Sequence, residues 1–196
     1  MRKLTLNMTT TVDGFIAKPD GTLWEAFPWP EEMQEFTTDF FRQVDTAIYG
    51  RLTYEMIVPW WHSVAIRKPP ADVPITEREI ELANLLEDIT KVVFSRTMDA
   101  ETTHALVFEG DVVENVMELK RQPGGHIVLH GGAGLVAKLA QARLIDEYML
   151  FVSPAAIGTG KPLFSGLQQE LRLTLLETRV FNSAFTMLRY EPAASA

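Results

Sequence analysis

Three glycines within four positions separate an apolar strand pattern from a helical pattern in the second half of the chain. The strand pattern ends at Leu129, the glycines are Gly131, Gly132 and Gly134, and helical spacing follows to Leu139. The first N–H groups of a helix lack partners within it, and the helix dipole adds partial positive charge there. Glycine lets a phosphate approach without meeting a Cβ atom. The pattern predicts either an anion-binding turn or a tight turn that packs a helix closely on a sheet.

Two other predicted strands end in residues that could contact the same ligand. Tyr49 is followed by Gly50 and Arg51, and a later strand is followed by Ser95 and Arg96. In an open α/β sheet, ligands bind outside the carboxyl ends of the strands. Each signal is weak alone, because an arginine after a strand is more often a solvated charge. Together, the three strand ends predict a pocket for a small molecule with several phosphates.

Two common phosphate-binding motifs do not match the sequence. The glycine spacing differs from the Rossmann pattern. That pattern also has an acidic residue at the end of the next strand, whereas Asp146 and Glu147 lie before the next strand. Gly160 and Lys161 are followed by Pro162 in place of the serine or threonine of a P-loop. Neither motif is present in the chain.

The predicted elements alternate between strand and helix and then become consecutive strands. Helices are predicted from Pro30 to Val44, from the capping box of Thr76 and Glu79 to Leu86, from Asp111 to Arg121, and after the glycine turns at Gly50 and Gly134, with residues 59–74 irregular. Strands are predicted at residues 4–12, 47–49, 91–95, 105–108, 127–129, 148–152, 171–180 and 184–190. The pattern predicts one α/β domain over residues 1–196, with a mainly parallel central sheet flanked by helices and a C-terminal antiparallel hairpin at its edge.

Composition excludes several classes of protein. The 196 residues carry a formal net charge of −8, which argues against a nucleic-acid partner. The chain has no cysteine, its four histidines are scattered, and neither a metal site nor a disulfide is predicted. No apolar run is long enough for a membrane span, and the N-terminus does not resemble a signal peptide, so a cytoplasmic protein is expected.

Five motifs in a fixed order give the chain a resemblance to a known family. They are Thr11–Ala17, Gly50–Glu55, Val93–Arg96, Gly131–Gly134 and Gly158–Phe164. The chain resembles the dihydrofolate reductase superfamily. It is most similar to stand-alone proteins akin to the C-terminal reductase domain of the bifunctional riboflavin-biosynthesis deaminase-reductase. The resemblance implies a dihydrofolate reductase-like fold, NADPH as the cofactor, and often a homodimer.

The resemblance also implies which residues would bind the cofactor. Thr53 would lie at the diphosphate, while Ser95 and Arg96, with Arg51, would hold the adenosine ribose and its 2′-phosphate. Two guanidinium groups suit a phosphate dianion and favour NADPH over NADH. The complete expected set is Ile16 and Ala17 at the nicotinamide, Gly50, Arg51, Leu52, Thr53, Ser95 and Arg96 along the phosphates and ribose, and Gly131, Gly132, Ala133, Gly134 and Leu135 around the diphosphate.

The implied reaction is reduction of a C=N or C=O group in a small heterocycle, with the hydride supplied by the cofactor. Glu32 matches the family's acid early on the first helix, and Asp13 is the second candidate. The alternatives are that Glu32 is a solvated first-turn acid and that Asp13 belongs to an ordinary Asp-Gly turn. The substrate stays open between a pterin, a folate and the riboflavin-pathway pyrimidine of a 5-amino-6-(5-phosphoribosylamino)uracil reductase. The alternative is an NADP(H)-binding sensor or scaffold without turnover.

Aromatic side chains gather in the segments outside the predicted strands. Trp24, Phe27, Trp29, Trp60 and Trp61 could stack on a flat heterocyclic ring, or they could bury a lid or a dimer contact. His130, which precedes the glycines, is expected to be a hydrogen-bonded core residue and not a catalyst.

Overall fold

The computed structural model describes residues 1–24, 30–70, 73–100, 103–182 and 185–194. In these residues an eight-stranded sheet is formed by β1 (Leu4–Thr11), β3 (Val44–Gly50), β4 (Thr90–Phe94), β5 (Leu106–Phe108), β6 (His126–His130), β7 (Glu147–Ser153), β9 (Leu173–Phe181) and β10 (Phe185–Pro192). The helices are α1 (Glu31–Phe41), α2 (Arg51–Ala65), α3 (Glu77–Asp88), α4 (Val112–Arg121) and α5 (Ala133–Gln141). The short strands β2 (Phe15–Ala17) and β8 (Lys161–Pro162) form a separate antiparallel pair.

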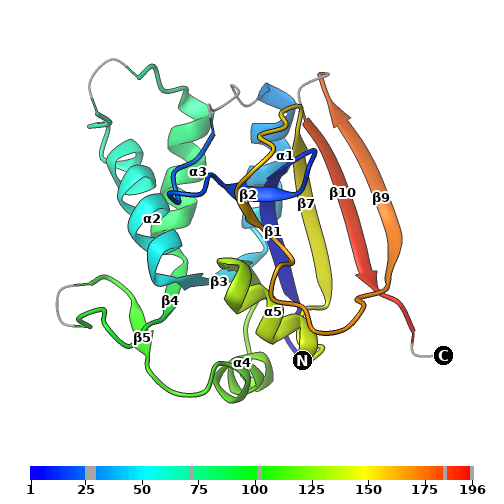
Figure 1. The fold of residues 1–196 in the computed structure, drawn as a ribbon. Helices are drawn as coiled ribbons and strands as arrows, with labels where there is room; N and C mark the ends of the chain where they lie inside the picture. The colour runs from blue at the N-terminus through cyan, green and yellow to red at the C-terminus, as the bar shows by residue number, and fades with distance from the viewer. Residues whose placement is uncertain (25–29, 71–72, 101–102, 183–184, 195–196) are drawn as a thin grey trace.

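The sheet is parallel except at one edge, as the sequence predicted. Its strand order is β5-β4-β3-β6-β1-β7-β10-β9, and only the β7–β10 and β10–β9 pairs are antiparallel (Figure 1). Gly50 pairs with Phe94, and Tyr49 pairs with His130. The carboxyl ends of β3, β4 and β6 therefore lie together, and the polar residues that follow them share one rim of the sheet.

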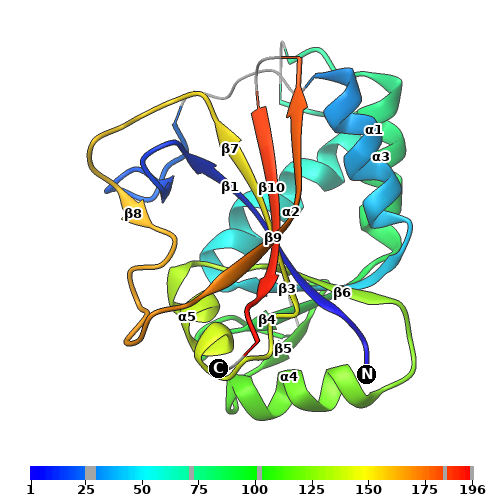
Figure 2. The same cartoon turned by 90° about the vertical axis from the view of Figure 1, so that its right-hand side faces the viewer.

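Helices cover both faces of the sheet (Figures 1 and 2). One face packs against α4 and α5 around a core that includes Leu6, Ile127 and Leu139. The other face packs against α1, α2 and α3, in clusters that contain Val93 and Met33. Both layers bury apolar side chains from the sheet, which explains why the middle of β6, Ile127–Leu129, is apolar at every position and does not alternate.

Two predicted helix starts are confirmed by their caps. The Thr76 hydroxyl accepts the Glu79 N–H at 3.1 Å, and the Glu79 carboxylate accepts the Thr76 N–H at 2.7 Å. The Asp111 carboxylate accepts the N–H groups of Val113 and Glu114. These local hydrogen bonds satisfy donors that a helix leaves free at its first turn.

The prediction that residues 59–74 are irregular was wrong in its first part. Helix α2 continues through Pro59 to Ala65. A proline inside a helix costs about 3 kcal/mol, because its ring lacks an N–H and crowds the preceding turn. Here Trp61 and Val64 on the same helix pack against α3 and its surroundings. This tertiary contact outweighs the local signal.

Charged side chains gather at the amino ends of the parallel strands. The Glu147 side chain is only 3% exposed and forms ion pairs with Lys3 and Arg189, the latter through Nε at 2.7 Å. Lys120 is buried, and its ammonium donates to the Leu144 carbonyl at 2.7 Å and to the Asp146 carboxylate. This amino-end charge cluster lies at the end of the sheet opposite the glycine turns.

One face of the antiparallel edge exposes apolar side chains. Val180 is 60% and Leu175 54% exposed on β9, and their partners on β10 are Thr186 and Tyr190. Among the described residues, β9 pairs with β10 alone and forms the end of the sheet. No helix in the described part of the chain has both the length and the apolar character that a bilayer span requires.

Candidate functional site

Two helix N-termini meet at the carboxyl ends of the central strands. Gly50 ends β3 and caps α2, and Gly132 caps α5 directly after β6. Neither cap has a side-chain hydrogen bond to the helix. A Cβ atom on Gly50 would lie 3.8 Å from the backbone nitrogen of Gly132. The two first turns therefore present their N–H groups, and the positive ends of both helix dipoles, to one region.

A cavity of about 620 Å³ lies at this junction, within the range typical of small-molecule sites. It is lined by Gly50, Arg51, Leu52, Thr53, Gly132, Ala133, Gly134, Leu135, Gly160, Lys161, Pro162 and Ser165. The structure thus brings together the residues after β3 and those after β6, which the sequence analysis had joined in one pocket. Strand β8 and the residues after it supply the opposite wall.

The three glycines of the turn have different surroundings. A Cβ atom on Gly131 would lie 3.1 Å from side-chain atoms of both Leu129 and Leu135, so this glycine permits close packing of α5 on the sheet. A Cβ atom on Gly132 or Gly134 would meet nothing within 4 Å. Gly131 therefore fits the interpretation of a tight packing turn, whereas Gly132 and Gly134 leave open space beside the cavity.

The opposite wall depends on contacts with the segment after β1. Ala17 pairs with Lys161, and a side chain on Gly160 would collide with the Ala17 carbonyl. The Asp13 carboxylate accepts the Gly158 N–H at 2.8 Å and the Ile157 N–H at 3.1 Å. Hydrogen bonds, first from Thr11 and then from these two amides, hold the pKa of Asp13 below its ordinary value.

Ser95 and Arg96 follow the strand residue that pairs with Gly50, so they share its rim, but neither lines the cavity. The Ser95 hydroxyl accepts the N–H groups of Thr97 and Met98 and so closes its own turn. Arg96 is exposed, and within the described residues it forms no ion pair. Arg51, in contrast, already donates to both carboxylate oxygens of Glu55, at 3.0 and 3.1 Å.

The residues predicted to act at the nicotinamide and the substrate do not gather at the cavity. Ile16 is half-buried and Ala17 is buried on β2. Glu32 is exposed in the first turn of α1 and is not among the residues that line the cavity. Phe27 and Trp29 lie outside the described residues. Trp60 and Trp61 pack in a cluster with Val64 of α2 and with Ile80 and Ala83 of α3, which is a contact between helices.

His130 lies between two aromatic rings at the end of β6. Its ring stacks on Tyr49 at 5.4 Å and on Phe41 at 5.8 Å between centroids. Its Nδ1 lies 3.2 Å from the Asn7 carbonyl oxygen, and the contact suits a neutral ring with the proton on Nδ1. Burial lowers the pKa of His130 to about 4. The expected hydrogen bond to the core is therefore present.

Because of His130, we expect the free energy of unfolding to fall as the pH is lowered, at pH values above those at which carboxylates titrate. In the unfolded chain His130 takes up a proton near its ordinary pKa of 6.5, but the folded protein resists protonation down to about 4. The free energy of unfolding should therefore fall by about 2 kcal/mol from about pH 7 to about pH 5. His130→Phe keeps the stack and should remove this part of the slope in urea titrations; equal slopes for both proteins would contradict the assignment.

Sequence reasoning missed the wall formed by Gly160, Lys161, Pro162 and Ser165. The sequence analysis excluded Gly160 and Lys161 from a P-loop and predicted no binding role for them. A usable signal was present, because the motif Gly158–Phe164 was one of the five that carry the family resemblance. Its position over the cavity depends on pairing with β2, more than 140 residues earlier, and no local pattern encodes that pairing.

Similar proteins place the chain in a family. The uncharacterized protein YyaP of Bacillus subtilis (strain 168) is 34% identical over 189 residues, which are 96% of this chain and 94% of that protein. The fold resembles a diaminohydroxyphosphoribosylaminopyrimidine deaminase/5-amino-6-(5-phosphoribosylamino)uracil reductase from Thermotoga maritima, with a TM-score of 0.69 and 16% identity over 98% of this chain and 57% of that one. It also resembles dihydrofolate reductase from Enterococcus faecalis complexed with NADP(H), with a TM-score of 0.59 and 16% identity over 98% and 97% of the chains. Because the RibD C-terminal domain family matches residues 2–187, this chain belongs to that family and has its dihydrofolate reductase-like fold.

Proposed function

We propose that the protein is an NADPH-dependent reductase of a small heterocyclic substrate. The observation that carries this proposal is the pair of helix N-termini at Gly50 and Gly132, both without side-chain caps, on one cavity. A dinucleotide diphosphate fits this arrangement, because it accepts several N–H hydrogen bonds and gains from both helix dipoles. The open space at Gly132 and Gly134 admits its oxygens.

The residues that the sequence analysis predicted for the cofactor would take separate roles along such a molecule. Thr53 and the N–H groups after Gly50 and Gly132 would hold the diphosphate, together with Ala133 to Leu135. Arg96, with Ser95 and Arg51, would hold the 2′-phosphate at the neighbouring strand end. Ile16 and Ala17 would contact the nicotinamide and keep water from it. The bound cofactor would supply a hydride to a C=N or C=O carbon.

A proton must reach the nitrogen or oxygen of the reduced group. Glu32 and Asp13 are the proposed donors. Asp13 is engaged with the amides of Ile157 and Gly158, which favours Glu32 of this pair. The substrate class is a pterin, a folate or the ribosylaminouracil of riboflavin synthesis, in accord with the names of the similar reductases.

A second candidate function has one observation in its favour. The residues that line the cavity include no carboxylate. A protein that binds NADP(H) as a sensor or scaffold would need no acid there. The two functions separate in one assay: the protein is mixed with NADPH and dihydrofolate, a pterin or the ribosylaminouracil, and absorbance of the reduced nicotinamide is followed. Oxidation of NADPH supports the reductase, and binding without oxidation across these substrates supports the sensor.

Arg96→Ala should weaken NADPH binding by about tenfold and leave NADH binding nearly unchanged. The reason is that a guanidinium–phosphate pair is lost only with the cofactor that has a 2′-phosphate. Fluorescence titration of both reduced cofactors measures the effect, with Arg121→Ala, which removes an exposed arginine at the far end of α4, as a control for net charge. Equal losses for the two cofactors would remove Arg96 from this role.

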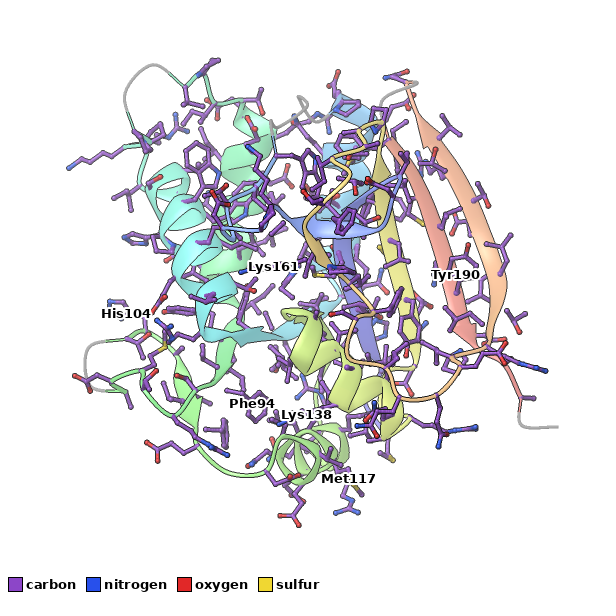
Figure 3. All side chains as sticks on the ribbon, in the orientation of Figure 1. Phe94, His104, Met117, Lys138, Lys161 and Tyr190 are labelled. Atoms are coloured by element: carbon purple, nitrogen blue, oxygen red, sulfur yellow. The ribbon has the colours of Figure 1, made fainter. Side chains whose placement is uncertain are left out.

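A homodimer is part of the proposal. The outer face of the antiparallel edge exposes Val180 and Leu175 beside Tyr190, which Figure 3 labels on β10. An uncovered apolar face on an edge strand is what a second copy would bury. Light scattering should give twice the mass of one 22.1 kDa chain, and a monomer would refute this part. A cytoplasmic location follows from the proposed use of NADPH, which cells keep inside.

A further inference from the structure

We propose that Lys161 binds the cofactor diphosphate from the wall opposite the two helix N-termini, and that Asp13 is the positioning residue that holds Lys161 there. The inference rests on the proposed function and deepens it. Lys161 comes from β8, whereas the N–H groups come from α2 and α5, so a diphosphate would be held from both sides of the cavity.

Lys161 is a cation at this cavity with no counterion among the described residues. Figure 3 shows it projecting from the segment that crosses in front of the sheet. Its ammonium lies against the turn at Gly21, where an added Cβ atom would be 3.0 Å away. Asp20, next to Gly21, forms no ion pair with Lys161 in the described part of the chain, and its Oδ1 accepts the N–H and the hydroxyl of Thr22. Arg51, the other cation that lines the cavity, is paired with Glu55.

The position of Lys161 depends on a set of contacts that begins at Asp13. The Asp13 carboxylate holds the amides of Ile157 and Gly158, and Gly158 has a positive φ of 71° that suits the tight turn. On either side, the Val12 N–H donates to the Ala155 carbonyl and the Leu163 N–H donates to the Gly14 carbonyl. Residues 155–163 are thus held against the turn after β1 by hydrogen bonds, and Lys161 lies within this segment.

This arrangement assigns Lys161 a different part of the cofactor from Arg96. NADPH and NADH share the diphosphate, so loss of Lys161 affects both cofactors. Loss of Arg96 affects only the cofactor with the 2′-phosphate. A lysine ammonium acts on a phosphate as a point charge, and its contribution at an exposed site depends on ionic strength.

The test uses the full chain, with cofactor affinity measured by the fluorescence of the bound nicotinamide. Lys161→Gln weakens NADPH and NADH by the same factor, about tenfold, and the loss shrinks as salt is added. Lys138→Gln is the matched control, because Lys138 is an exposed lysine of α5 that does not line the cavity (Figure 3). Asp13→Asn weakens both cofactors about threefold to fivefold in the wild-type background and has no further effect in Lys161→Gln, since coupled residues are not additive.

Every other result contradicts one part of the proposal. If the wild-type protein binds neither cofactor, the proposed function fails and this inference fails with it. If it binds both and Lys161→Gln behaves like Lys138→Gln, the inference alone fails. A loss confined to NADPH moves Lys161 to the 2′-phosphate and ends its diphosphate assignment. Additive effects of Asp13→Asn and Lys161→Gln end the positioning role, as does fast hydrogen exchange at Ile157 and Gly158 in the wild-type protein.

Discussion

Gly132→Asp is expected to weaken NADPH binding by about 100-fold without loss of stability. The new carboxylate would repel the cofactor diphosphate and replace about two of its charge-assisted hydrogen bonds. Gly132 has an ordinary φ of −70° and lines the cavity, and an added Cβ atom meets nothing within 4 Å. Aspartate is also a strong helix cap. Its carboxylate would bond to the free N–H groups of α5 and so occupy the donors that the phosphate needs. The melting temperature should therefore rise while the affinity for NADPH falls, which thermal melting and cofactor titration would measure.

The neighbouring glycine provides the contrasting control. Gly131→Ala introduces a Cβ atom 3.1 Å from side-chain atoms of Leu129 and Leu135, and this should lower the free energy of unfolding by about 1 kcal/mol. Gly132→Ala should change neither property much, since its methyl group enters open space. If Gly132→Asp bound NADPH normally, the cavity would not be the phosphate site.

Glu147→Ala is expected to lower the free energy of unfolding by about 3 kcal/mol and to leave cofactor affinity unchanged. The Glu147 side chain is 3% exposed and is paired with Lys3 and Arg189. Its removal leaves two cations, each about one-third exposed, without their main partner. The amino-end charge cluster lies across the sheet from the cavity, so binding should be spared. Urea unfolding and NADPH titration of the same samples check both statements.

Glu177→Ala is the matched control, because Glu177 pairs with the same Arg189 at 3.2 Å but is 39% exposed, and such a pair contributes less than about 1 kcal/mol.

Burial acts to raise the pKa of Glu147, but hydrogen bonds from Arg189 and Lys3 hold it below the ordinary 4.5. The stability that this carboxylate contributes is present above that value and is lost as pH falls through the folded pKa. The gap between wild type and Glu147→Ala should close in acid, and a gap that persisted there would have another origin.

Local signals predicted much of the fold and the base of the site. The cap of Thr76 and Glu79 and the glycine at Gly50 act through neighbouring residues, so their effect is readable in a short window. The parallel sheet followed from alternating patterns. Because carboxyl ends of parallel strands share a rim, joining Gly50 with Gly132 in one pocket needed no knowledge of the strand order.

Non-local contacts account for what the sequence analysis missed. Pro59 signals a helix end within its own window, and only the packing of α2 on α3 shows that the helix continues. Lys161 lies on a strand of two residues whose partner is β2. The contact of Asp13 with Gly158 joins residues 145 positions apart. Such pairings depend on the whole chain having folded.

The direct junction of β3 and α2 has a practical consequence for inhibitor design. Gly50 is both the last residue of the strand and the cap of the helix, so no linker separates the sheet from the base of the cavity. A compound fitted to that base would meet a preorganised surface and lose little free energy in ordering it. A compound extended toward β8 would depend on a short strand pair outside the main sheet. Fragment screening should therefore begin at the two helix termini and grow outward from there.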